Sequence, residues 1–274
     1  MPGFNGMRVL SVESRRAQEI AHLIRSNGGV PIVAPSTREQ EIANSEVEQI
    51  VNRILAGEFH AIILMTGVGS RALLHAAERI CARTEFIAAL LRARIIVRGP
   101  KPAAVARELN LTITLSVPEP NTWREIVTAL DQNPDRVPVK DQHILIQEHG
   151  EPSTELSEAL RDRGAQISTV QVYRSELPED ISPLKSAISE VAAKKIDVVL
   201  FTSSVQFTHA FRIAKEMGLS DSFLGGLQHA MVASIGPVCS ETLRKNGVRV
   251  DFEPSHPRMG FLVKEAAEKA VQSH

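Results

Sequence analysis

The chain has few cysteines, few aromatic residues and almost no net charge. Its two cysteines, Cys81 and Cys239, are far apart and lack C-x-x-C spacing, which excludes a disulfide framework and gives no zinc-binding motif. We therefore expect unpaired thiols and no metal. Aromatic residues make up 4% of the chain, with one Trp and one Tyr, and the net charge is −1. Nucleic-acid binders need a basic face or stacking aromatics, so we expect no nucleic-acid partner.

Long apolar runs are also missing. No run approaches the roughly 20 residues that span a bilayer. The N-terminal segment MPGFNGMRVLSVESRR has no basic stretch followed by a long apolar stretch, as a signal peptide would have. We expect a cytoplasmic protein without membrane contact and, because no exposed apolar stripe stands out, a monomer. At 274 residues, 43% hydrophobic and 23% charged, the chain is long enough to bury a core.

The sequence contains an internal repeat. Residues 62–66, IILMT, resemble residues 198–202, VVLFT, at an offset of 136 positions. Two further pairs keep nearly the same offset: Gly99-Pro100 with Gly236-Pro237, and Arg25 to Gly29 with Arg161 to Ala165. Three matches whose offsets agree within one residue predict a tandem duplication that fills most of the chain.

Each copy alternates apolar strands with amphipathic helices. Strands that are apolar throughout are typical of parallel sheets covered by helices on both faces. We therefore expect an α/β fold with two doubly wound parallel-sheet domains and a cleft between them. In such sheets, ligands bind beyond the carboxyl ends of the strands, where both threonine-containing segments and both Gly-Pro turns fall.

The four strand ends share a chemistry that suits anions. At residues 66–70 and 202–206, small residues and unpaired backbone N–H groups precede a helix, and the helix dipole favours negative charge there. The Gly-Pro turns offer the same arrangement, with proline set for the first helical turn. Ordinary N-capping explains each end taken singly. Four such ends directed at one cleft favour an anion site.

One segment imitates a dinucleotide-binding fingerprint. Residues 67–72, GVGSRA, fit G-x-G-x-x-A after a strand and before a helix. The fingerprint also requires an acid at the end of the next strand, where this chain has Arg98, and the duplicate copy has Ser203 and Ser204 in place of glycines. Nicotinamide binding is therefore disfavoured, and we expect no cofactor.

The order and spacing of these segments resemble the uroporphyrinogen-III synthase family. The segments that carry the resemblance are Ser14-Arg15-Arg16, GGVPIVAPS (28–36), LMTG (64–67), GAQISTVQVYR (164–174), DVVLFTSS (197–204), VASIGP (232–237) and SHPRMGFLV (255–263). The family converts hydroxymethylbilane, a linear tetrapyrrole, into uroporphyrinogen III in porphyrin and haem biosynthesis. The reaction is a lyase reaction that loses water, closes the ring and inverts ring D, without a cofactor. The resemblance also allows a transient hand-over of substrate from hydroxymethylbilane synthase.

The resemblance implies domains that are not the sequence halves. Domain A would comprise residues 1–35 and 176–274, and domain B residues 36–168. Two extended linkers, at about residues 30–36 and 167–175, would join them. Contiguous halves divided near Asp135 are the competing arrangement.

The resemblance also implies a set of site residues. The residues placed around the substrate are Thr66, Gly67, Val68, Gly69, Gly99, Lys101, Thr202, Ser203, Ser204, Gly236, Pro237, Val238 and Cys239. Charged contacts of lesser specificity, each equally explained as a surface charge, are Arg15, Arg71, Arg98 and His256. Tyr173, the only tyrosine, matches a family tyrosine proposed to help the hydroxyl leave, because a phenol can donate a hydrogen bond to the leaving oxygen. A hinge tyrosine that packs the linker is the alternative.

Two departures and two alternatives bear on this interpretation. Many family members have threonine after the Gly-Pro turns, where this chain has Lys101-Pro102 and Val238-Cys239. Hydroxyl contacts are lost there.

The same fold could serve as a non-catalytic tetrapyrrole- or metabolite-binding sensor. A two-lobed periplasmic solute-binding protein would need an export signal that we do not find.

Overall fold

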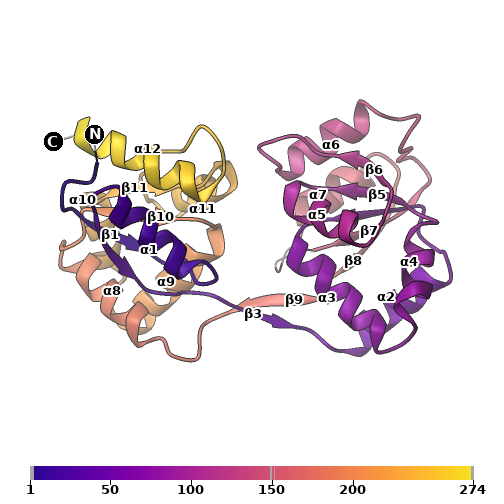
Figure 1. Ribbon diagram of the computed structural model, residues 1–274, viewed down its shortest axis with the longest axis horizontal. Helices are drawn as coiled ribbons and strands as arrows, with labels where there is room; N and C mark the ends of the chain where they lie inside the picture. The colour runs from indigo at the N-terminus through magenta and orange to yellow at the C-terminus, as the bar shows by residue number, and fades with distance from the viewer. Residues whose placement is uncertain (1–2, 149, 151, 273–274) are drawn as a thin grey trace. The chain divides into compact units, whose positions relative to one another are not determined.

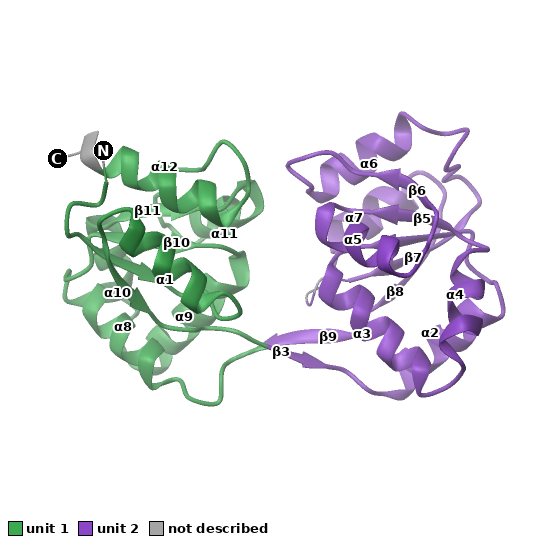
Figure 2. Cartoon of the chain, in the orientation of Figure 1, with its two compact units in different colours: residues 1–38, 176–274 green, residues 39–175 purple. Residues whose placement is uncertain are grey.

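The computed structural model describes residues 3–148, 150 and 152–272. It divides into two compact units, unit 1 with residues 1–38 and 176–274, and unit 2 with residues 39–175 (Figure 2). The chain passes from one unit to the other through strands β3 (Arg38–Glu41) and β9 (Tyr173–Glu176), which form a two-stranded sheet. Contiguous halves divided near Asp135 do not fit, because β7, after that residue, pairs with β4, before it.

Unit 2 is built on a five-stranded parallel sheet in the order β6-β5-β4-β7-β8. Its strands are β4 (Ala61–Leu64), β5 (Arg94–Val97), β6 (Ile113–Ser116), β7 (His143–Gln147) and β8 (Gln166–Val170). One face packs against α2 (Ser45–Leu55), α3 (Gly67–Glu78), α4 (Arg83–Leu90) and α5 (Pro100–Glu108). The other packs against α6 (Trp123–Asp131) and α7 (Thr154–Arg161) (Figure 1). Burial on both faces explains why β4 reads AIIL, with every side chain buried.

Unit 1 is built on a four-stranded parallel sheet in the order β11-β10-β1-β2. Its strands are β1 (Arg8–Ser11), β2 (Val30–Val33), β10 (Val198–Phe201) and β11 (Met231–Ser234). One face packs against α8 (Ser182–Ala192), α9 (Ser204–Glu216), α10 (Ser220–His229) and α11 (Pro237–Lys245). The other packs against α1 (Ala17–Ser26) and α12 (Met259–Gln272) (Figure 1). Within the described residues, no helix is both long and apolar enough to cross a membrane.

The two sheets have the same topology, which confirms the predicted pair of doubly wound α/β folds. Strands β4, β5, β7 and β8 of unit 2 correspond in order and pairing to β10, β11, β1 and β2 of unit 1. Among the described residues, the helices follow the same plan, with four on one face and two on the other. At the position of the edge strand β6, unit 1 has a parallel bridge between Ala233 and Phe252.

The segments expected to be linkers belong largely to the sheets. Residues 30–33 pair with β1, and residues 166–170 pair with β7, so both are regular sheet strands. The segments that join the units, β3 and β9, follow several residues later. The prediction was wrong here because a β-branched extended segment after a helix has the same pattern whether it joins a sheet or leaves it.

Candidate functional site

Thr66 lies at the carboxyl end of β4 and begins helix α3. Its backbone is extended, and its Oγ1 accepts a hydrogen bond from the N–H of Gly69 at 3.0 Å. The Ser70 hydroxyl donates to the Thr66 carbonyl at 2.8 Å. This is the N-capping arrangement that threonine favours, and it fixes the position of the Thr66 hydroxyl. We call the carboxyl ends of a unit's parallel strands, with the helix starts that follow them, the rim of that unit.

Tyr173 meets Thr66 at this rim. The phenolic oxygen lies 3.2 Å from Thr66 Oγ1, and the tyrosine side chain is 5% exposed. Its ring also packs beside Gly150, where a Cβ atom would lie 3.1 Å from the ring carbon Cε2. The hydroxyl that the sequence singled out is therefore held in a defined place, next to a second predicted site residue.

Arg98 supplies positive charge to the same place. It follows β5, and burial lowers the pKa of its guanidinium while its charge interaction with Tyr173 acts in the opposite direction. Arg71, by contrast, forms an exposed ion pair in which its Nη2 atom lies 3.0 and 2.7 Å from the carboxylate oxygens of Glu108, the last residue of α5. Arg98 thus interacts with the charge of Tyr173, whereas Arg71 pairs with Glu108.

The glycines after Thr66 are tightly packed. A Cβ atom on Gly69 would lie 1.9 Å from Nε2 of Gln147, and one on Gly67 would lie 3.0 Å from the backbone oxygen of Lys101. Gln147 is fully buried, and its Oε1 accepts from the Thr66 N–H at 3.4 Å. The fingerprint-like GVG segment therefore has an explanation that involves no dinucleotide.

The start of α5 completes the rim of unit 2. Gly99 is the N-cap residue, and a Cβ atom on it would lie 3.0 Å from the Asn121 side chain. Lys101 is exposed in the first helical turn, whereas Pro102 is buried, and Val68 is half-buried at the start of α3. Unit 2 thus presents two cations, a phenol and two helix N-termini at one edge of its sheet.

The rim of unit 1 is organised by a carboxylate. Thr202, after β10, donates its hydroxyl hydrogen to Glu13 Oε2. Gln206 Nε2 donates to the same carboxylate oxygen at 3.0 Å and to Thr202 Oγ1 at 2.7 Å, and its Oε1 accepts from the Thr202 N–H at 2.8 Å. Glu13 Oε1 accepts from the backbone N–H of Arg16, at the start of α1, at 3.1 Å. The Thr202 hydroxyl hydrogen is therefore used within the protein.

The other predicted residues of unit 1 lie at helix starts. Ser203 is the N-cap of α9 and Ser204 its first residue, and both are half-buried. At the start of α11, Gly236 is the N-cap, Pro237 the first residue, and Val238 is 44% exposed. Cys239 is buried, and burial raises the pKa of its thiol to about 11, so it stays protonated at neutral pH and is no nucleophile.

The charged residues predicted for unit 1 lie on its surface. His256 is exposed in the segment before α12, and its ring stacks edge-on against Phe261 with centroids 4.9 Å apart. A Cβ atom on Gly236 would lie 3.7 Å from Pro257, so this segment adjoins the start of α11. Arg15 is exposed just before α1.

Three residues that shape these rims were missed by the sequence analysis: Glu13, Gln147 and Gln206. At the offset of 136 positions, Glu13 corresponds in sequence to residue 149, a histidine, so the repeat gave no signal for this glutamate. The glutamines gave no signal, because glutamine is mostly exposed in proteins and the sequence does not indicate that these two are buried.

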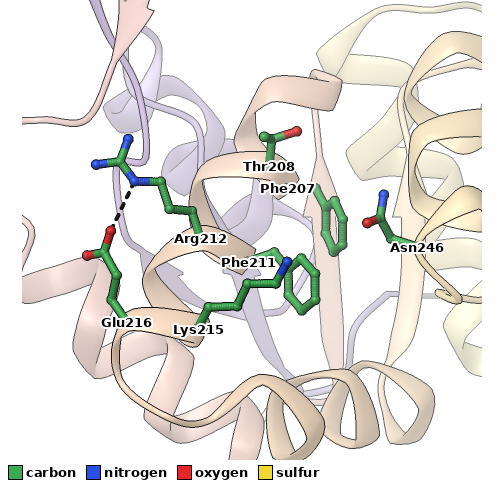
Figure 3. Close-up of a pocket in the computed structure, with 7 residues that line it drawn as sticks. All are labelled: Phe207, Thr208, Phe211, Arg212, Lys215, Glu216 and Asn246. Carbon is green, nitrogen blue, oxygen red and sulfur yellow. Dashed lines mark hydrogen bonds and ion pairs between the residues drawn. The ribbon is translucent and has the colours of Figure 1, made fainter.

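A pocket of about 390 Å³ lies elsewhere on unit 1 (Figure 3). It is lined by the later turns of α9 and by Asn246, the C-cap of α11. Phe207 and Phe211 stack with centroids 5.5 Å apart, and Lys215 Nζ lies 4.4 Å from the centre of the Phe211 ring. None of the predicted site residues lines this pocket, so it is separate from the strand ends.

At the opposite end of the unit 2 sheet, His143 is a titrating group. Its Nε2 lies 3.0 Å from Ser168 Oγ and 3.2 Å from Arg53 Nη2. Burial, followed by the charge of Arg53, lowers the pKa of His143 from its ordinary 6.5. Below pH 6.5 the unfolded chain therefore binds more protons than the folded protein, and folding stability is lost as the pH falls from 6.5 toward the lowered pKa.

We expect the free energy of unfolding, measured with urea between pH 7.5 and 5, to decrease below pH 6.5. His143→Gln should flatten this decrease, because glutamine does not titrate. His22→Gln, at an exposed position on α1, serves as the control and should leave the pH dependence in place. Equal pH dependence in the wild type and His143→Gln would contradict the assignment.

A family model described as uroporphyrinogen-III synthase HemD matches residues 18–264 of this chain. Among similar sequences, the uncharacterised protein YjjA of Bacillus subtilis is 27% identical over 97% of both chains. A protein of Methanothermobacter thermautotrophicus, provisionally named a uroporphyrinogen-III synthase, is 27% identical over 85% of this chain and 87% of its own.

Solved structures with the same fold agree with the family match. A mutant uroporphyrinogen III synthase of Thermus thermophilus superimposes with a TM-score of 0.71 at 21% identity, covering 98% of this chain and 100% of its own. The Helicobacter pylori enzyme gives 0.52 at 15% identity, covering 97% and 99%. The family model extends over most of the sequence and spans both units. This chain belongs to the uroporphyrinogen-III synthase family.

Proposed function

We propose that this protein is a uroporphyrinogen-III synthase that converts hydroxymethylbilane into uroporphyrinogen III. The observation that carries the proposal is the contact between the Tyr173 hydroxyl and Thr66, beside Arg98, at the carboxyl end of a parallel sheet. The family match supports it. We further propose that it acts in the cytoplasm as a monomer and takes its substrate from hydroxymethylbilane synthase.

The first requirement of this reaction is that the enzyme binds the substrate carboxylates. Hydroxymethylbilane is a flexible chain with eight carboxylates that closes spontaneously to the symmetric type I isomer. The enzyme must hold the chain so that the substituted carbon of ring D is the one attacked. Arg98, Lys101 and the N–H groups at the starts of α3 and α5 suit carboxylate binding.

The second requirement is departure of the terminal hydroxyl. Thr66 Oγ1 and the phenolic oxygen of Tyr173 lie 3.2 Å apart, and either hydroxyl can donate. In the substrate complex, Thr66 donates to the phenolic oxygen and Tyr173 donates to the substrate hydroxyl, and the positive charge of Arg98 makes the phenol a better donor. The C–O bond breaks, the hydroxyl leaves as water, and the pyrrole nitrogen loses its proton to give the azafulvene. The azafulvene methylene bonds to the substituted α-carbon of ring D and gives a spiro intermediate. The bond from that carbon to the methylene bridge of ring C then breaks, the bridge bonds to the free α-carbon of ring D, and loss of the proton on that carbon completes the inversion.

The test is an isomer assay. Hydroxymethylbilane is generated in situ by its synthase, this protein is added, and the products are oxidised and separated as porphyrin isomers. We expect predominantly type III. Only type I, from protein shown to be folded by circular dichroism, would overturn the proposal and leave a non-catalytic tetrapyrrole-binding protein.

A further inference from the structure

The two rims are related by duplication, yet their chemistry differs. Arg98 and Lys101 of unit 2 correspond, at an offset of 137 positions, to Ile235 and Val238 of unit 1. Both cations are therefore replaced by apolar side chains at equivalent strand and helix ends, and Val238 is 44% exposed. The two rims therefore differ in side-chain charge, although both present helix N-termini.

Unit 1 also carries a negative charge at its rim. The Glu13 side chain, two residues after β1, is half-exposed. A carboxylate offers about four acceptor positions. Thr202 and Gln206 fill two on Oε2, and the Arg16 N–H fills one on Oε1. Counting only donors from the described part of the chain, one acceptor position of this carboxylate remains, and the side chain is half-exposed.

This carboxylate is poorly suited to a ligand carboxylate and well suited to an N–H donor. Like charges at close range repel, and the Thr202 hydroxyl cannot donate to a ligand because its hydrogen is used by Glu13. A pyrrole combines an N–H donor with an apolar ring. Exposed Val238, and Phe261 at 38% exposure, offer apolar surface near the start of α11 and in α12.

We propose that the rim of unit 1 recognises pyrrole N–H groups, with Glu13 as the acceptor and Thr202 and Gln206 holding its carboxylate in position. This inference rests on the proposed function for its ligand class. In this proposal the two rims bind different groups of the ligand: unit 2 binds carboxylates, and unit 1 accepts hydrogen bonds from pyrrole N–H groups.

The experiment compares two probes by titration calorimetry under anaerobic conditions. Uroporphyrinogen III carries pyrrole N–H groups and carboxylates, whereas benzenehexacarboxylate carries carboxylates alone. Glu13→Gln keeps the side-chain shape and an acceptor for the Arg16 N–H but loses the charge. We expect its affinity for uroporphyrinogen III to fall about tenfold, the range for a hydrogen bond to a charged group. Its affinity for benzenehexacarboxylate should stay equal or rise.

The matched control is Glu19→Gln, which removes a charge from an exposed Glu19–Arg16 pair on α1 and should change neither affinity. If Glu13→Gln does not fold, the wild type with tetra-N-methyl uroporphyrinogen replaces it, and we expect about tenfold weaker binding than with the N–H form. Unchanged affinity in either comparison, or no binding of uroporphyrinogen III by the wild type, overturns the inference. Both readouts are independent of the isomer assay, so failure of catalysis and failure of N–H recognition are distinguishable.

Discussion

Gly226→Ala should lower the free energy of unfolding of unit 1 by about 3 kcal/mol, whereas the neighbouring Gly225→Ala should raise it by roughly 0.5–1 kcal/mol. Gly226 is buried where α10 packs on α8, and a Cβ atom there would lie 1.9 Å from the carbonyl oxygen of Val191 and 2.6 Å from its carbonyl carbon. Backbone cannot yield as a side chain does. The helices must separate, and the core beneath them loses contacts.

Gly225→Ala is the matched control for Gly226→Ala. Gly225 is exposed on the same helix, and a Cβ atom there would have nothing within 4 Å, so alanine gains only helix propensity. The substitution is the same in both variants, and the difference between them isolates the contact with Val191. We expect thermal unfolding, followed by calorimetry, to place the two variants about 10 °C apart. Closely similar melting temperatures would mean that α8 and α10 can move apart at little cost.

The architecture could be predicted because it depends on regular patterns. The offset of 136 positions between IILMT and VVLFT marks two equivalent strands, and the structure places them as β4 and β10 at the centres of equivalent sheets. Apolar side chains at every strand position required cover on both faces. Both inferences use only the order and spacing of residue types, which can be observed directly in the sequence.

The boundaries and the polar interior could not be predicted in the same way. Val30–Val33 is extended in either a linker or a sheet, and only the pairing with β1 decides between them. Gln147 and Gln206 act through side-chain amides whose partners, Thr66 and Thr202, are identified only by the folded geometry. Glu13 reaches Thr202 across 189 positions of sequence. Hydrogen bonds between residues so far apart in the sequence cannot be predicted from a local sequence pattern.

The glycine-rich segment after β4 shows how one pattern serves two physical needs. A dinucleotide fold uses its glycines so that the backbone can approach a pyrophosphate. Here Gly69 makes room for the Gln147 amide, and Gly67 for the backbone of Lys101. The second contact brings the starts of α3 and α5 together, which places two helix N-termini at the rim where we propose that carboxylates bind.

Tyr173→Phe should lower the turnover number for type III formation about tenfold while leaving the fold intact. Phenylalanine keeps the ring that packs beside Gly150 and removes only the hydroxyl that lies 3.2 Å from Thr66. The loss is moderate because the hydroxyl of hydroxymethylbilane also leaves spontaneously. Because departure of water is the step that Tyr173 assists, the turnover number should fall while KM stays nearly constant.

Variants of Thr66 separate this role from simple packing. Thr66→Ser retains the hydroxyl and should keep both turnover and stability. Thr66→Val removes it, and should lower turnover together with the melting temperature, because α3 also loses its cap. If Tyr173 only packs the strand that joins the units, Tyr173→Phe will retain full turnover, and Thr66→Val will change stability alone. A fall in turnover in Tyr173→Phe without a change in melting temperature supports the donor role, because the variant keeps the packed ring and lacks only the hydroxyl group.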